Sequence, residues 1–196
     1  MSVRVEALTG ALLTAHLPDV ARLRIEVFRA YPYLYDGDLA YERDYIAAFA
    51  AAPNAVIVAA FDGDEVVGAS TAAPLRAQVG KVTAPFRSRG DDLSAYFYFG
   101  ESVLRASYRG HGIGVRFFEE REAHARACGA RYAAFCSVVR PAEHPARPKG
   151  YEPLDAFWGK RGYAPEPGLI CNMSWKEIGA LAESAKPMQF WTKRLS

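Results

Sequence analysis

Residues 108–114 read YRGHGIG, a turn with three glycines between a strand-forming segment and a helix-forming one. The N–H groups in the first turn of a helix have no partner within the helix, and the helix dipole favours negative charge there. Glycines let an oxygen-rich ligand approach such a turn without meeting a Cβ atom. Two alternatives are therefore open for this turn: an anion-binding loop, or a helix start that needs small residues for packing.

The glycine spacing excludes two common phosphate-binding motifs. A dinucleotide-binding turn has the spacing GxGxxG, whereas residues 110–114 have GxGxG and continue into the helix. A P-loop ends in Gly-Lys followed by Ser or Thr, which this turn lacks. What remains is the pattern Arg-x-x-Gly-x-Gly, formed by Arg109, Gly112 and Gly114.

The turn must be positioned by a mixture of helices and strands. Apolar periodicity predicts helices over residues 18–31, 39–52, 113–128 and, more briefly, 154–160. Strands are expected over residues 2–7, 55–61, 65–72, 95–104, 131–139, 169–176 and 188–193. The Asp62-Gly63-Asp64 turn predicts a tight hairpin, and residues 78–92 are expected to form a surface loop.

The composition is that of one globular domain. The chain has 196 residues, of which 51% are hydrophobic and 23% are charged, and its net charge is +2. Scattered Lys and Arg produce no field that favours nucleic acid, and the first ten residues lack a signal-peptide core. Cys128, Cys136 and Cys171 have neither metal-binding nor disulfide spacing. We therefore expect one cytoplasmic domain over residues 1–196 without a metal, nucleic-acid or membrane partner, and leave a homodimer open.

The run VLRASYRGHGIG at residues 103–114 resembles the acetyl-coenzyme A (acetyl-CoA) motif of the GNAT-type N-acetyltransferases. That motif reads Arg or Gln, two residues, Gly, any residue, and Gly or Ala. Residues 157–163, FWGKRGY, are also similar to the FYxKxGF-like segment of the family. The resemblance implies a GNAT-like α+β (mixed α/β) fold, with a central, mostly antiparallel, splayed sheet of about seven strands flanked by about four helices.

The resemblance also implies where acetyl-CoA binds. The pyrophosphate is expected on the backbone N–H groups of Gly110, His111, Gly112, Ile113, Gly114 and Val115. Arg109 is expected to brace the loop or the phosphates. The pantetheine arm is expected to pair, as an extra strand, with Ser102, Val103 and Leu104.

Acetyl transfer to an amine needs a base, because a protonated amine must lose a proton before it attacks. Glu101 is the first candidate, since it lies in an otherwise apolar strand. Strand alternation places it on one face with Phe97, Phe99 and Val103. Such neighbours disfavour a charged carboxyl and make it a stronger base. Gly100 predicts a bulge that re-aims Glu101. The alternatives are a solvent-exposed acid or an ion pair with Arg105.

The departing thiolate needs a proton donor, for which the sequence offers weaker candidates. Trp158 stands where the family often has Tyr, and an indole has no acidic proton to give. Tyr163 or Tyr151 is the substitute that the sequence allows, with a packing role as the alternative for each.

Residues 31–38, YPYLYDGD, match the loop that lines the acceptor pocket in the family. Tyr33, Tyr35 and Asp36 suit a cationic, partly apolar amine, although a solvated turn with packed tyrosines is an equal alternative. Three basic residues of a later loop favour an acidic acceptor instead: His144, Arg147 and Lys149. The acceptor class therefore stays open.

These features favour an N-acetyltransferase that moves an acetyl group from acetyl-CoA to a primary amine of a small molecule or a peptide N-terminus. Direct transfer is expected, because no Cys or Ser stands beside a convincing His base. The alternative is a catalytically weak acyl-CoA-binding sensor or regulatory module, which Trp158 favours.

Overall fold

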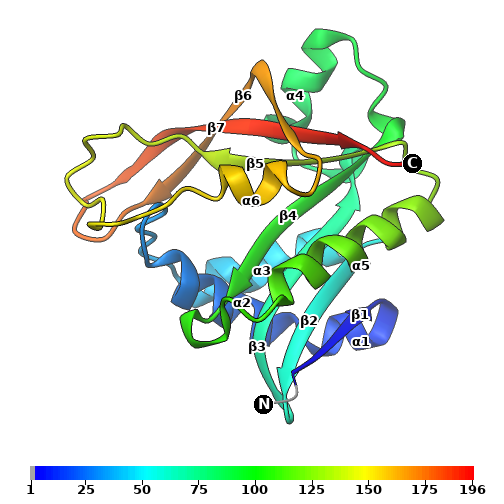
Figure 1. Cartoon of the computed structure of the whole chain (residues 1–196), viewed down its shortest axis with the longest axis horizontal. Coiled ribbons are helices and arrows are strands. Elements are labelled where there is room, and N and C mark those ends of the chain that lie inside the picture. The colour runs from blue at the N-terminus through cyan, green and yellow to red at the C-terminus, as the bar shows by residue number, and fades with distance from the viewer. Residues whose placement is uncertain (1–2) are drawn as a thin grey trace.

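The computed structural model describes residues 3–196, which fold around one seven-stranded sheet (Figure 1). The strands are β1 (Arg4–Leu8), β2 (Val56–Asp62), β3 (Glu65–Pro74), β4 (Tyr96–Leu104), β5 (Tyr132–Val138), β6 (Ala164–Lys176) and β7 (Glu183–Arg194). They are arranged in the order β1-β2-β3-β4-β5-β7-β6. Only the β4–β5 pair is parallel within the described residues, so the expected mixed, mostly antiparallel sheet is confirmed.

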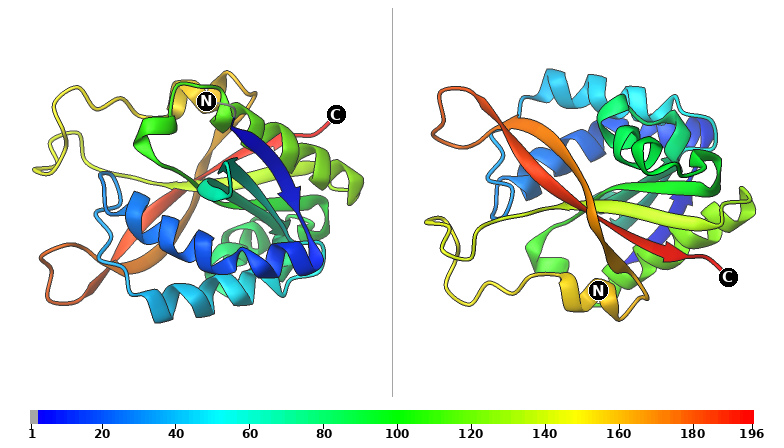
Figure 2. Two further views of the ribbon diagram at one scale, coloured as in Figure 1. Left: turned by 90° about the horizontal axis from the view of Figure 1, so that it is seen from below. Right: turned by 90° about the horizontal axis from the view of Figure 1, so that it is seen from above.

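Six α-helices cover the sheet within residues 3–196, where about four were expected. They are α1 (Gly10–Ala15), α2 (Leu17–Phe28), α3 (Leu39–Ala50), α4 (Gly80–Arg89), α5 (Ile113–Ala127) and α6 (Asp155–Gly159). Helices α1 to α4 bury Leu23, Ile46 and Phe86 on one face of the sheet, whereas α5 and α6 cover the other face around Phe117 (Figure 2). None of these helices is long and apolar enough to cross a membrane.

Residues 78–92 correct the expectation of a surface loop, because α4 occupies most of them. The helix buries Val82 and Phe86 and ends at Gly90, whose φ is 85°. Pro85 lies inside it and removes one backbone donor. Burial of one helical face outweighs that loss, since packing rather than local propensity stabilises most short helices. The expected first strand began at Ser2, which lies outside the described residues.

Strands β4 and β5 diverge after three residue pairs. They pair from Tyr96–Tyr132 to Tyr98–Ala134, and β4 then continues to Leu104 while pairing with β3 alone (Figure 1). Over residues 99–104 the β5-facing edge of β4 therefore has no strand partner in the described chain. This arrangement confirms the splayed sheet.

Candidate active site

A cavity of about 2080 Å³ opens between the diverging strands. Its walls come from α2 and α3, the bulged half of β4, the end of β5, the glycine turn, α6 and the β6–β7 hairpin. Pockets for drug-sized ligands reach only about 1,000 Å³. The cavity therefore has room for two substrates at once.

The glycine turn supplies a row of free donors at one side of this cavity. Gly110 and Gly112 both have φ of 81°, and a Cβ atom at either would meet nothing within 4 Å. Helix α5 begins immediately after Gly112, so the N–H groups of this turn precede or open the helix. Within residues 3–196, the backbone N–H groups of residues 110–114 donate no hydrogen bond to a backbone acceptor outside α5. The Val115 N–H, by contrast, donates to Gly112 O at 3.0 Å and is already used.

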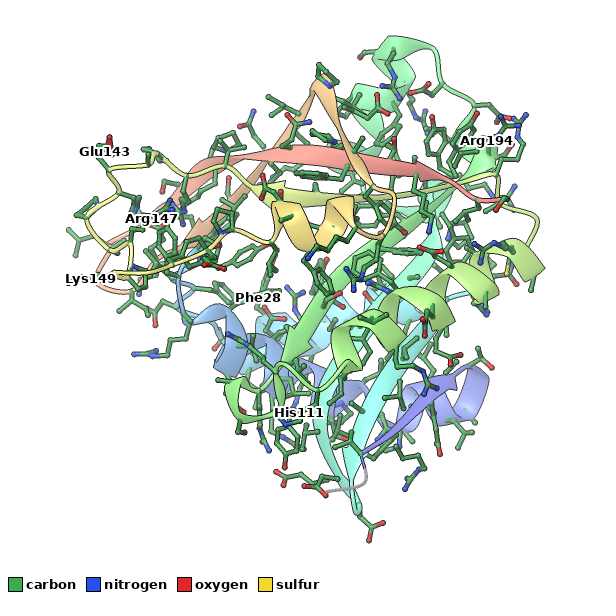
Figure 3. All side chains as sticks on the ribbon, viewed as in Figure 1. Phe28, His111, Glu143, Arg147, Lys149 and Arg194 are labelled. Atoms are coloured by element: carbon green, nitrogen blue, oxygen red, sulfur yellow. The ribbon has the colours of Figure 1, made fainter. Side chains whose placement is uncertain are left out.

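This row of donors has the geometry of an anion site. It lies at the N-terminus of a 15-residue helix, where the dipole adds positive potential. His111 is exposed on the same turn (Figure 3), whereas Ile113, the first residue of α5, is buried in the core. Gly114 has a packing role instead, because a Cβ there would lie 3.3 Å from the Phe157 ring. Gly110 and Gly112 thus have the geometry of the anion-binding alternative, and Gly114 that of the packing alternative.

Two side chains hold the turn in place. Arg109 Nε donates to Leu104 O at 3.3 Å, and Tyr108 Oη donates to Asp62 Oδ2 at 2.7 Å. Arg109 also lines the cavity, so it braces the loop and can still reach a ligand. The turn is thereby tied to β4 and to the β2–β3 hairpin.

The end of β4 forms the wall next to this turn. Ser102 and Leu104 line the cavity, whereas the Val103 side chain is fully buried. All three pair with β3 along one edge, as Ser70–Ser102 and the following pairs show. Their other edge faces the splay and is available to an extended ligand.

Glu101 lies at a β-bulge, as Gly100 predicted. Ser70 of β3 pairs with Ser102 of β4, and Ala72 pairs with Phe99. Between these two pairs the chain advances two residues along β3 but three along β4. The extra residue reverses the face of every later side chain.

The bulge corrects the expected surroundings of Glu101. Phe97 and Phe99 belong to the core under α5, whereas Val103 and Glu101 lie on the α2 side. Glu101 is 5% exposed, and its Oε2 accepts from Arg24 Nη1 at 2.5 Å. Its neighbours are therefore not all apolar, and Arg105 is not its partner, since Arg105 pairs with Glu26 and Glu65.

Arg24 joins two carboxylates at the floor of the cavity. Its Nε donates to Glu42, its Nη1 donates to Glu101, and its guanidinium lies over the rings of Phe28 and Tyr45, at 5.1 and 4.4 Å from their centroids. Burial opposes its charge, but the surrounding carboxylates outweigh burial and raise the pKa of Arg24. Glu42 Oε1 and Glu101 Oε1 are both buried without a hydrogen-bond partner within residues 3–196.

The sequence reasoning missed Arg24 and Glu42, although both carry a signal. Arg24 falls on the helical stripe that includes Val20 and Phe28, and Glu42 falls on the stripe of Ile46 and Phe49. Opposite charges on two apolar stripes indicate a buried ion pair between neighbouring helices.

Tyr163 lies outside the cavity. It is buried under α5, and its Oη donates to Glu122 Oε1 at 3.1 Å. Burial and the Glu122 carboxylate raise the pKa of Tyr163. Tyr151 does line the cavity, and Trp158 packs against Phe135. The structure thus does not bring Tyr163 together with the other candidate residues.

The loop after α2 lies at the cavity wall, as expected. Tyr33, Tyr35 and Asp36 all line the cavity. The loop is held by the β6–β7 hairpin: Trp175 Nε1 donates to Tyr33 O at 2.9 Å, and Lys176 pairs with Asp36 at 3.0 Å. Burial raises the pKa of Tyr33, which therefore remains an uncharged phenol.

The later basic loop contributes little to the cavity. Lys149 is exposed at the outer edge of this loop (Figure 3). Arg147 lines the cavity, but its Nη2 donates to Tyr151 O at 3.3 Å. His144 Nδ1 accepts from a backbone N–H in its own loop.

Comparison with known proteins gives one family. The model of the Acetyltransferase (GNAT) family matches residues 20–148. YncA from Salmonella typhimurium, solved with its cofactor acetyl-CoA, is similar in fold with a TM-score of 0.63 and 10% identity, over 100% of this chain and 95% of that one.

Two further structures cover nearly complete chains. Ribosomal-protein-alanine N-acetyltransferase from Brucella melitensis gives a TM-score of 0.62 at 14% identity, over 98% of this chain and 99% of that one. An aminoglycoside 6′-N-acetyltransferase complexed with coenzyme A gives 0.58 at 19% identity, over 100% and 98%. No curated protein sequence matches the chain. At these identities the structures show a shared fold.

Proposed function

The chain belongs to the GNAT acetyltransferase family, and we propose that it transfers an acetyl group from acetyl-CoA to a primary amine of a small molecule or of a peptide N-terminus. One observation carries the proposal: free backbone donors and an unpartnered buried carboxylate oxygen border the same two-substrate cavity. The donors suit a phosphate, and the carboxylate suits the proton of an amine.

The residues of the glycine turn and β4 fit the cofactor. The N–H groups of residues 110–114 would hold its pyrophosphate, with Arg109 at their side. The free edge of β4 at residues 102–104 would pair with the pantetheine arm. When bound, acetyl-CoA supplies the acetyl group as an activated thioester. Replacing Gly110 or Gly112 by Ala would strain the backbone of this turn, because both positions have positive φ.

Glu101 is the proposed general base. Its Oε1 is free to accept a proton from the amine, directly or through one water. Its Oε2 is fixed by Arg24, which makes Arg24 a positioning residue. Glu101 lies at the bulge, in the part of β4 beyond its last pair with β5, Tyr98–Ala134.

Direct transfer is supported by the state of Cys136. Cys136 lines the cavity, and a hydrogen bond with Cys171, followed by burial, raises the pKa of the Cys136 thiol. A protonated thiol is a poor nucleophile. Cys128 Sγ lies 3.7 Å from His124 Nε2, but neither of these residues lines the cavity.

Two measurements test the proposal against the alternative of a non-catalytic acyl-CoA sensor. Calorimetry measures acetyl-CoA binding, and a thiol-release assay measures transfer to a panel of primary amines and peptide N-termini. We expect binding together with thiol release on at least one amine. Binding without release on any amine would favour the sensor, and no binding would contradict both.

A further inference from the structure

We propose that Glu42 forms a subsite for a second basic nitrogen of the acceptor, so that the substrate class is a small amine with at least two basic nitrogen atoms. This inference rests on the proposed function, because it takes Glu101 as the group that receives the proton of the reacting amine. The reacting nitrogen must be neutral when it attacks. It therefore cannot balance the charge of a second carboxylate, whereas another cationic nitrogen can.

Glu42 is buried and has an unpaired hydrogen-bond acceptor, as a ligand-binding carboxylate would. It is 0% exposed and borders the cavity, yet its Oε1 accepts no hydrogen bond within residues 3–196. Buried polar atoms in folded proteins are nearly always paired, so an unpaired one facing a cavity indicates a missing partner. A carboxylate accepts only, so that partner must be a donor.

The local charges favour a cationic donor. Arg24 is the only cation in ion-pair contact with Glu42 among the residues described, and it is shared with Glu101. Arg121 adds a Coulomb interaction with Glu101 from the α5 side, where its Nη1 donates to Thr71 O at 3.4 Å. Glu42 is thus the carboxylate of this floor whose one ion-pair partner among the described residues is shared. A buried charge without a full partner is costly, and a bound ammonium group would relieve that cost.

Tyrosines line the same cavity as Glu42. Burial, followed by the interaction of its hydroxyl with Glu42 through hydrogen bonding and charge, raises the pKa of Tyr35, so this hydroxyl stays uncharged. Tyr33 and Tyr45 border the same cavity and are likewise uncharged, because burial raises the pKa of each. Aromatic faces attract cations and cover the apolar chain between two nitrogens. The Tyr35 hydroxyl can occupy one acceptor site of Glu42, and the carboxylate keeps others for a ligand.

The same contacts disfavour an acidic acceptor. The basic loop residues that favoured it lie at the rim: Lys149 is exposed, and Arg147 is bonded to Tyr151 O (Figure 3). The buried floor instead presents two carboxylates to one shared arginine. An acceptor carboxylate would face that floor with like charge.

A matched ligand series tests the inference on the unmodified protein. The series is a diaminoalkane, an amino alcohol and an ω-amino acid of equal chain length, repeated over several lengths. Calorimetry measures their affinities for the protein saturated with coenzyme A. We expect the best diamine to bind at least about tenfold more tightly than its amino alcohol, with the amino acid weakest. Equal binding of diamine and alcohol, or tightest binding of the amino acid, would overturn the inference.

A variant pair locates the effect. Glu42→Gln keeps an acceptor for Arg24 but removes the charge, and we expect the diamine preference to fall below about threefold. The control is Glu152→Gln, which removes an exposed carboxylate of the same cavity and should keep the preference. Thermal unfolding checks that each variant is folded, and the ligand series decides the question if Glu42→Gln is not. A diamine preference without acetyl transfer would refute the proposed function alone, and transfer without the preference would refute this inference alone.

Discussion

Arg24 Nη1 donates to Glu101 Oε2 at 2.5 Å, although 77 positions separate the two residues in the chain. The contact joins α2 to the bulged part of β4, and the same guanidinium binds Glu42 on α3. One buried cation therefore connects the acceptor-side helices to the strand that carries the candidate base. Stability and catalysis should both depend on it.

Replacing Arg24 by Met should strongly destabilise the fold. The change leaves Glu42 and Glu101 buried without an ion-pair partner among the described residues, which typically costs about 3–5 kcal/mol. The control is Arg22→Met on the same helix, whose side chain is 64% exposed and should cost less than about 0.5 kcal/mol. Urea denaturation of both variants measures the difference. Similar losses for the two would show that the buried ion pair contributes nothing particular.

Replacing Gly100 by Ala should destabilise the bulge. A Cβ atom there would lie 2.4 Å from Thr71 Oγ1, which is itself buried without a hydrogen-bond partner within residues 3–196. We expect a loss of about 1–3 kcal/mol, as for other overpacked sites. Adding Thr71→Ala should recover most of that loss, because it removes the atom in conflict. A double-mutant cycle in urea measures the coupling, and additive losses would contradict the steric explanation.

Replacing Tyr163 by Phe should lower stability and leave turnover unchanged. Its hydroxyl bonds to buried Glu122 and does not reach the cavity. Loss of that bond should cost about 1 kcal/mol in thermal or urea unfolding. The kcat of the folded variant should equal that of the wild type. A large fall in kcat with unchanged stability would restore Tyr163 as the thiolate proton donor.

Replacing Gly112 by Ala should weaken acetyl-CoA binding. Gly112 and Gly129 have φ of 81° and 80°, and a Cβ atom at either position would meet nothing within 4 Å. The two substitutions should therefore cost similar backbone strain, about 1–3 kcal/mol. Only Gly112 lies on the turn at the start of α5, since Gly129 follows the end of that helix. Calorimetry should show reduced acetyl-CoA affinity for Gly112→Ala alone, and equal losses in both would contradict the role of the turn.

Local chemistry made much of the fold predictable. The Asp62-Gly63-Asp64 turn requires a tight hairpin, and the glycine pattern at residues 110–114 marks the start of α5. Helix α4 was not predicted, because Pro85 and the flanking glycines favour a loop locally, and only the burial of Phe86 reveals the helix.

The site was predictable only in part, for a geometric reason. The bulge at Gly100 was predicted, but its effect on the alternation of side chains was not. Regular alternation predicts that Glu101 shares a face with Phe97, whereas the bulge turns it toward α2. The partners of Glu101 come from distant helices, so no spacing along the chain reveals them. The positions of Arg24 and Glu42 on apolar helical stripes were the available signal.

The kcat of Glu101→Gln tests the central claim most directly. With the best amine of the panel, kcat should fall about 10²–10⁴-fold, because the proton acceptor is lost. The Kd for acetyl-CoA should stay unchanged, and Glu152→Gln should retain wild-type kcat. Measurements at several pH values separate loss of a base from a change in substrate protonation. Wild-type kcat for Glu101→Gln across that range would contradict the assignment of Glu101 as the base.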